Sequence, residues 1–345
     1  MVLSHLLALM STFPATTAYA ESPRTVEARV AVRGAELAVS LLLPDRSKEA
    51  RVPALLILPG SGPSTRAESA ALAEPFLRHG FAVLTFDKRG CGASSGSWLT
   101  SSLEDMAEDG RTLFEWLKAR SEVDGSRTGI MGVSQGGWVA PLVASSREDV
   151  AFLIALTGGG LSPRVVERFD YERRLERAGV TGADLAIARR TIDAYFAFLA
   201  GEVAQGAVTS LLDSGKERSW PGALGIERVL PSEAQRPFWS WVASFDPAPS
   251  IRGLRLPVLV LIGGEDRDPA EEVRVWQASL KTASDPRTEI RVVPGAGHIL
   301  TVGGNHMRGI FNTAALEAMA AWAAAVSAPS ALSAPGSGAS RGDPE

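Results

Sequence analysis

The hexapeptide at residues 132–137 is the feature that most restricts how this chain can fold. It reads Gly-Val-Ser-Gln-Gly-Gly, follows the apolar run 128–131 and precedes the helix-compatible stretch 138–146. A G-x-S-x-G sequence in this setting is typical of a sharp strand-to-helix turn that lifts its serine clear of a sheet. The flanking glycines leave room where the backbones crowd. The segment therefore predicts Ser134 as an exposed, candidate covalent nucleophile.

Segments typical of strands and of helices alternate along most of the chain. The strand-like segments are 26–32, 35–43, 53–58, 81–86, 128–133, 151–156, 257–262 and 288–293. The helix-like segments are 66–79, the stretch opened by a Ser101/Glu104 capping box, 135–146, 270–281 and 308–326. A turn at Arg33-Gly34 indicates an antiparallel hairpin between the first two strands. The later alternation indicates an α/β fold whose mostly parallel central sheet has helices on both faces.

This alternation stops in the middle of the chain. Residues 161–250 contain no convincing strand, whereas 164–178 and 184–199 are helical in pattern. The first of these stretches is dense in Arg and Glu, which we interpret as a solvated face. The aromatic residues of this segment are expected to pack the segment onto the core of the fold rather than to line a pocket. We expect a helical lid here, inserted between two strands of the sheet.

The resulting division of the chain has five parts. They are a signal peptide at 1–20, a first core part at 21–160, the lid at 161–250, a second core part at 251–326 and a tail at 327–345. The tail is rich in Ala, Ser, Pro and Gly, a composition typical of disorder.

The N-terminal segment predicts export. Its apolar run is too short to span a bilayer and ends in Ala18-Tyr19-Ala20, an A-x-A-like cleavage site. This pattern favours a secreted or periplasmic protein. The segment contains no Lys or Arg, so a misassigned start or a disordered extension on a cytoplasmic protein is the alternative.

Overall charge and composition restrict the partners. The net charge of −4 comes without a basic block, so nucleic acid is not an expected partner. No later segment is apolar over a length that would span a membrane. The chain has one cysteine, Cys91, which excludes an internal disulfide. No signal for an oligomeric state is present.

The scarcity of histidine narrows the search for a general base. A serine hydroxyl needs a neighbouring base, normally histidine, and an acid that orients it. Of the four histidines, His5 falls in the predicted signal and His79 at a helix end, where a cation is favourable for structural reasons. His298 follows a strand in a glycine-rich loop, and His306 lies close to the last helix. The position just after a strand favours His298.

Three acidic residues follow the strand that precedes this histidine. They are Glu265, Asp266 and Asp268. Asp266 stands in a turn directly after the strand, where the Ser…Asp…His order places the acid. Asp268 precedes Pro269 and is the second candidate, although it would also serve as a helix N-cap.

The remaining parts expected of such a site are two backbone N–H groups that stabilise a negative oxygen. Gln135, directly after the nucleophile, supplies one, and Ser61 in the glycine-rich loop 58–63 is the candidate for the other. No nucleotide-binding or metal-binding motif is present, so no cofactor and no metal are expected. Cys91 lacks the strand-to-helix setting of a nucleophile.

These motifs, in this order, resemble the α/β-hydrolase superfamily over about residues 53–325, and bacterial serine esterases and serine aminopeptidases within it. The resemblance implies Ser134 as nucleophile, Asp266 as acid and His298 as base, with Ser61 and Gln135 as oxyanion donors. One departure is Leu58-Pro59, where many relatives carry a histidine before the glycine.

Three functions are compatible with this resemblance. The first is hydrolysis of a small-molecule carboxylic ester through an acyl-enzyme. The second is a peptidase or amidase with the same triad, which would need lid carboxylates such as Glu167, Glu172 or Glu176 to hold a substrate ammonium. The third is a non-catalytic binding protein that retains the fold.

Overall fold

The structure, a computed structural model of the chain, describes residues 24–45, 50–280, 285–303 and 309–328. The predicted signal peptide at 1–20 lies outside the described residues, as do His5, His306 and residues 329–345 of the predicted tail.

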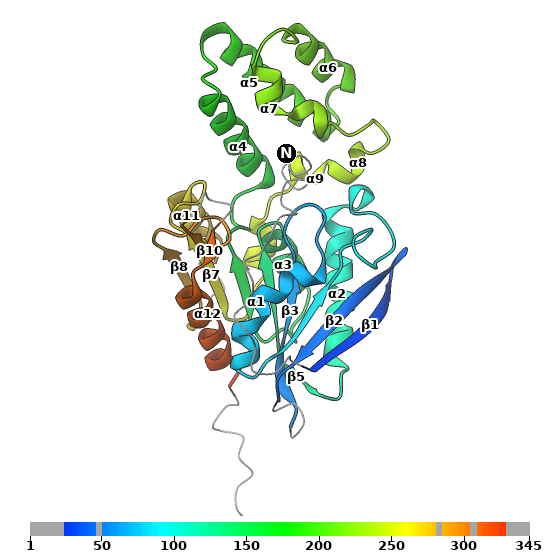
Figure 1. Cartoon of the computed structure of the whole chain (residues 1–345), viewed down its shortest axis with the longest axis vertical. Helices are drawn as coiled ribbons and strands as arrows, with labels where there is room; N and C mark the ends of the chain where they lie inside the picture. Colours follow the sequence, from blue (N-terminus) through cyan, green and yellow to red (C-terminus); the bar gives the residue numbers. More distant parts are fainter. Residues whose placement is uncertain (1–23, 46–49, 281–284, 304–308, 329–345) are drawn as a thin grey trace, which may run out of the picture.

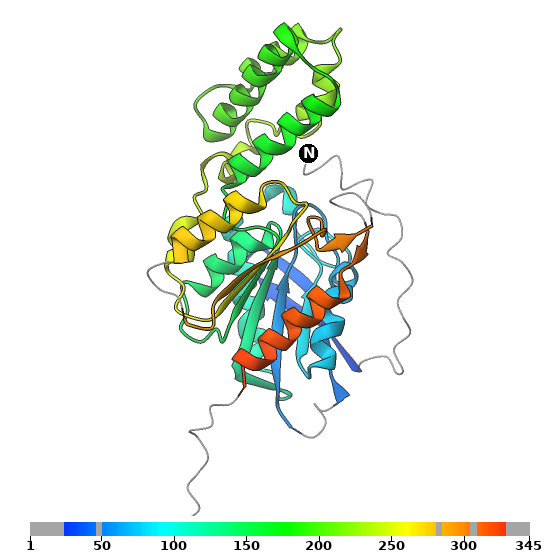
Figure 2. The same ribbon diagram turned by 90° about the vertical axis from the view of Figure 1, so that its left-hand side faces the viewer.

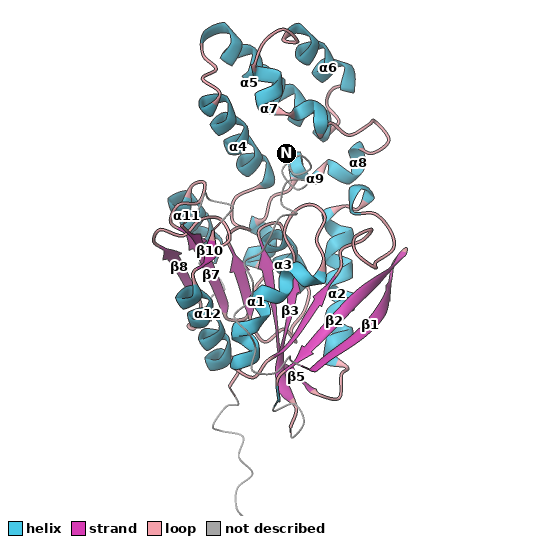
Figure 3. Cartoon of the chain, in the orientation of Figure 1, coloured by secondary structure: helices cyan, strands magenta, loops and turns pink. Residues whose placement is uncertain are grey.

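An eight-stranded sheet forms the centre of the molecule (Figures 1 and 3). Its strands are β1 (Arg24–Val32), β2 (Ala35–Leu43), β3 (Val52–Leu58), β4 (Ala82–Phe86), β5 (Val123–Val133), β6 (Leu153–Leu156), β7 (Val258–Gly263) and β8 (Glu289–Val293). They follow the order β1-β2-β4-β3-β5-β6-β7-β8. The six from β4 to β8 are parallel, whereas β1 and β2 form the predicted hairpin and β2 pairs antiparallel with β4. The predicted fold class is therefore confirmed.

Helices cover both faces of this sheet because its strands are apolar on both sides. On β3, Leu55 and Ile57 point into one hydrophobic cluster and Leu56 and Leu58 into another, as expected from the alternation of side chains along a strand. The first cluster is closed by α1 (Arg66–Arg78) and α12 (Thr313–Val326), the latter red-orange in Figure 2. The second is closed by α2 (Leu103–Lys118), α3 (Gly136–Ala144) and α11 (Pro269–Leu280).

Local capping differs from the prediction in one place. Helix α2 begins one residue later than expected, so the capping box is Ser102 with Asp105 and not Ser101 with Glu104. The Ser102 hydroxyl accepts the Asp105 N–H at 3.1 Å, and the Asp105 carboxylate accepts the Ser102 N–H at 2.9 Å. Ser101 is buried and donates to the carbonyl of Ser97 instead. A small hairpin, β9 (Thr301–Val302) with β10 (Ile310–Phe311), was not predicted.

Seven α-helices and one short 3-10 helix (Ile226–Arg228) lie between β6 and β7. The α-helices are α4 (Pro163–Arg177), α5 (Gly182–Ala200), α6 (Gln205–Ser214), α7 (Trp220–Leu224), α8 (Arg236–Trp239), α9 (Trp241–Ser244) and α10 (Ala248–Arg252). Most of this helical insertion stands beyond the edge where the parallel strands end (Figures 1 and 2). It has a hydrophobic cluster of its own, in which Trp220 and Trp239 are buried, whereas Trp241 packs against both this cluster and one of the sheet's clusters. No helix in the described ranges has both the length and the apolar character needed to cross a membrane.

Candidate active site

Ser134 occupies a strained turn between β5 and α3. Its φ of 53° lies in the left-handed region, which is costly for a residue with a side chain. Two hydrogen bonds hold the turn: the Ser134 N–H donates to Leu156 O at 2.9 Å, and the Gly137 N–H donates to Ser134 O at 2.8 Å. A Cβ on Gly132 would overlap the backbone of Gly136, so the crowding expected of this turn is present.

The structure brings Ser134, Asp266 and His298 together. His298 Nε2 lies 2.9 Å from Ser134 Oγ. On the other side of the ring, Nδ1 lies 2.9 and 3.0 Å from the two carboxylate oxygens of Asp266. Asp266 directly follows the turn after β7, and His298 lies in the loop after β8, so the ends of three parallel strands supply the group.

The charge state of Asp266 suits an orienting acid. Burial alone would raise its pKa, but the charge and hydrogen bond of His298 and the charge and N–H of Arg267 outweigh burial and lower the pKa below its usual value. An ionised Asp266 accepts a hydrogen bond from the protonated Nδ1 of His298. The unprotonated Nε2 then has its lone pair facing the Ser134 hydroxyl. This is the arrangement in which a histidine can act as a base.

The alternative residues have other contacts. The Asp268 carboxylate accepts the N–H of Glu271 at 3.1 Å, as an N-cap at the start of α11 does. His79 is the C-cap of α1 and lies 3.3 Å from the Glu317 carboxylate. Cys91 is buried, and burial raises the pKa of its thiol. None of these three groups reaches Ser134.

The loop between β3 and α1 lies beside Ser134. A Cβ built on Gly60 would lie 3.5 Å from Ser134 Cβ. The backbone N–H groups of Ser61 and Gln135 have no acceptor among the residues that the structure describes. Free N–H groups on both sides of a serine are what an oxyanion hole requires.

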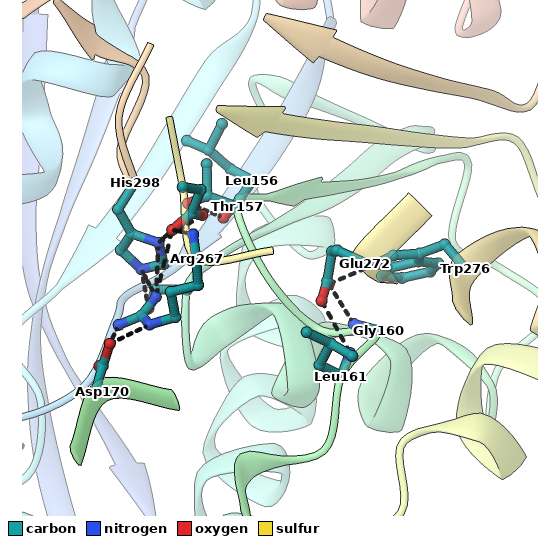
Figure 4. Close-up of polar contacts among 11 residues, drawn as sticks. Leu156, Thr157, Gly160, Leu161, Asp170, Arg267, Glu272, Trp276 and His298 are labelled. Atoms are coloured by element: carbon teal, nitrogen blue, oxygen red, sulfur yellow. Dashed lines mark hydrogen bonds and ion pairs between the residues drawn. The ribbon is translucent and has the colours of Figure 1, made fainter. Parts of the chain in front are cut away.

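Arg267 is a part of the site that sequence reasoning missed. Its Nη1 lies 3.0 Å from His298 Nδ1, while Nε and Nη2 donate to the Asp170 carboxylate at 2.9 Å each (Figure 4). Asp170 lies on α4, so this ion pair joins the helical insertion to the candidate site. The prediction that the charge run of α4 is a solvated face is therefore wrong for Asp170, whose side chain is largely buried. The pairing spans 97 residues and leaves no local signal in the sequence.

A second buried carboxylate fixes the segment that leads into α4. Glu272 accepts the N–H groups of Gly160 and Leu161 at 2.7 and 3.0 Å, and the indole N–H of Trp276 at 3.1 Å (Figure 4). Burial raises the pKa of Glu272 although these three donors oppose the shift.

A cavity beside the candidate site is lined by residues that include Ser134, Trp138, Leu161, Val166, Arg267 and His298.

Comparisons with known proteins identify the family and the fold of the chain. A sequence model of the X-Pro dipeptidyl-peptidase (S15) family matches residues 33–298. An uncharacterized protein of Mycobacterium tuberculosis is 35% identical over 102 residues, which are 30% of this chain and 35% of that protein. The chain thus spans about a third of the length of the curated relatives it first matches.

Solved structures share the fold at low identity. An esterase of Pyrococcus furiosus has a TM-score of 0.55 at 16% identity, with 90% of this chain and 95% of that chain covered. A proline iminopeptidase of Mycobacterium smegmatis has a TM-score of 0.54 at 16% identity, with 88% and 99% covered. At these identities the likeness concerns the α/β-hydrolase fold.

Proposed function

Since the chain belongs to the X-Pro dipeptidyl-peptidase (S15) family and has the α/β-hydrolase fold, we propose that it is a serine hydrolase that cleaves carboxylic esters through an acyl-enzyme. The observation that carries this proposal is the continuous path from Asp266 through His298 to Ser134, with 2.9 Å at both steps. A serine within hydrogen-bond reach of an oriented histidine is the signature of an activated nucleophile.

In the proposed reaction, Ser134 Oγ attacks the ester carbonyl while His298 Nε2 takes its proton. Asp266 holds the imidazole tautomer and stabilises the imidazolium. The N–H groups of Ser61 and Gln135 stabilise the negative oxygen of the tetrahedral intermediate. His298 then protonates the leaving alcohol, and water, activated by the same histidine, releases the acid from Ser134.

We assign access to this site to the helical insertion. Helices α4–α10 act as a lid in this proposal, and Leu161 and Val166 from its first segment line the cavity beside Ser134. The size and shape of the acyl group would then be selected by the lid, while the sheet edge supplies the chemistry. We also propose export, with residues 1–20 as the signal.

The proposal is tested with purified protein that begins at Glu21. The substrates are p-nitrophenyl esters of increasing acyl length, and the site probe is a fluorophosphonate that labels activated serines. We expect ester turnover and labelling by the wild type, and loss of both in Ser134→Ala. Labelling that persists in Ser134→Ala would overturn the assignment of the nucleophile. A folded wild type that is neither active nor labelled would favour a non-catalytic binding protein.

A peptidase is the second candidate, favoured by the family match and by one side chain. An N-terminal ammonium needs a carboxylate without another partner. Glu172 is paired with Arg189 at 2.9 Å and Glu176 is exposed, whereas Glu167 is half-buried near Arg267. Burial and the charge of Asp170 raise the pKa of Glu167. A smaller fraction of Glu167 is therefore ionised and able to pair with an ammonium.

The two candidates differ in substrate. Rates on acyl p-nitrophenyl esters are compared with rates on an X-Pro p-nitroanilide whose amino group is free. We expect kcat/KM to be higher for the esters than for the anilide. A preference for the anilide that is lost in Glu167→Gln but kept in Glu172→Gln would establish the peptidase instead.

A further inference from the structure

Lys88 is a buried cation that the proposed reaction does not use. It lies in the loop after β4 and is 5% exposed. Its neighbours are charge-paired, Asp87 with Arg66 and Arg89 with Asp109, but no carboxylate among the described residues pairs with Lys88. Burial lowers the pKa of Lys88 to about 8. An ammonium taken out of water without a counter-ion is costly, so its remaining contacts must matter.

Those contacts join two separate segments of the site. Lys88 Nζ donates to the carbonyl of Gly60 at 2.8 Å and to Oε1 of Gln135 at 2.9 Å. Gly60 belongs to the loop after β3, and Gln135 is the residue after Ser134. Through the side chain of Gln135, which is buried, one ammonium therefore links the loop to the strand-to-helix turn.

We propose that Lys88 is a positioning residue. It sets the relative positions of the two proposed oxyanion donors, the backbone N–H groups of Ser61 and Gln135. This inference rests on the proposed hydrolase function. The Gly60 carbonyl and the Ser61 N–H belong to one planar trans peptide, in which they point in opposite directions. Fixing the carbonyl toward Lys88 therefore fixes the N–H on the other side of the peptide.

The charge of Lys88 adds to this geometric role. A cation bound to a carbonyl oxygen polarises the peptide, so the Ser61 N–H becomes a stronger donor. The negative charge that this N–H stabilises exists in the tetrahedral intermediate and not in the bound ester. The contribution of Lys88 should therefore appear in kcat, with little effect on KM.

The test compares Lys88→Met with Cys91→Ala, a control at another buried position of the same loop. For Lys88→Met we expect a fall in kcat of about 10- to 100-fold, KM within about twofold, and a similar loss of affinity for a boronic acid that mimics the tetrahedral intermediate. Cys91→Ala should stay within about twofold in all three measurements. Rates are normalised to the folded fraction measured by circular dichroism.

A second variant covers the case in which Lys88→Met does not fold. Lys88→Gln keeps an N–H donor but removes the charge, and we expect its kcat to lie between those of the wild type and Lys88→Met. A folded Lys88→Met, or failing that a folded Lys88→Gln, with wild-type kcat and boronic acid affinity would overturn the inference. In that case an active, fluorophosphonate-labelled wild type leaves the proposed function standing. An inactive, unlabelled wild type overturns the proposed function and this inference together.

Discussion

The strand ends around Ser134 and the helical insertion are built in different ways. At the strand ends the backbone has almost no freedom. Ser134 has a φ in the left-handed region, and a Cβ at Gly132 or Gly136 would overlap neighbouring backbone atoms. The insertion has a hydrophobic cluster of its own, although Ile251 and Trp241 also pack against the sheet's cluster. An ion pair between Arg267 and Asp170 connects it to the candidate site. In the proposed function the chemistry depends on the rigid sheet edge, whereas access depends on the helical insertion. Substitutions in the two regions should therefore have different consequences.

The largest effect is expected from Asp266, because in the proposed reaction it sets the histidine tautomer. In Asp266→Asn the neutral amide neither holds the His298 tautomer nor stabilises the imidazolium as a carboxylate does. We therefore expect kcat/KM for the best ester to fall about 10³- to 10⁴-fold. Asp268→Asn is the matched control, since Asp268 accepts from the N–H of Glu271. Asn caps helices as well as Asp, so activity should stay within about twofold. Equal losses in the two variants would contradict the assignment of the acid.

Glycine substitutions compare the tolerance of the two regions directly. A Cβ on Gly136 would overlap the carbonyl of Leu58, which is backbone and cannot move aside. We expect Gly136→Ala to lower the free energy of unfolding by about 3 kcal/mol or more. In the insertion, Gly206 has open space around it, so Gly206→Ala should raise that free energy by about 0.5 kcal/mol. Chemical denaturation measures both, and a Gly136→Ala variant of wild-type stability would contradict the crowding argument.

Removal of the ion pair isolates what the insertion contributes to the reaction. Asp170→Asn removes one of the two carboxylates that pair with Arg267 and leaves Asp266, at 3.6 Å, as the other, so more positive charge remains 3.0 Å from His298 Nδ1. The extra charge disfavours the imidazolium that forms during attack, so we expect kcat/KM to fall about 10-fold. Glu172→Gln is the control on the same helix, because its partner Arg189 is exposed and such pairs contribute little. Similar losses in both variants would indicate a general disturbance of α4.

What the sequence could predict depends on the distance between the residues involved. The strand positions follow from local apolar segments, and Ser134, Asp266 and His298 from local turns at strand ends in a fixed chain order. Ser101 and Ser102 are adjacent, and each is followed three residues later by an acidic residue. Both positions therefore match a capping box, and the box was predicted one residue too early. The contacts of Lys88 and Arg267 span 28 to 97 residues, because they depend on how loops and helices pack. No periodicity or motif marks such contacts.

The smallest effect concerns Glu272, which ties the segment leading into the insertion to α11. Its pKa in the folded protein lies above the ordinary value of 4.5 because it is buried. Between these two pKa values the folded state binds the proton more tightly than the unfolded state, so this group contributes less stability as pH rises through that window. The difference in unfolding free energy between the wild type and Glu272→Gln should therefore shrink as pH rises from about 4.5. Denaturant titrations from pH 4.5 to 8 measure it, and a difference that grows with pH would show that hydrogen bonds to Gly160 and Leu161 outweigh burial.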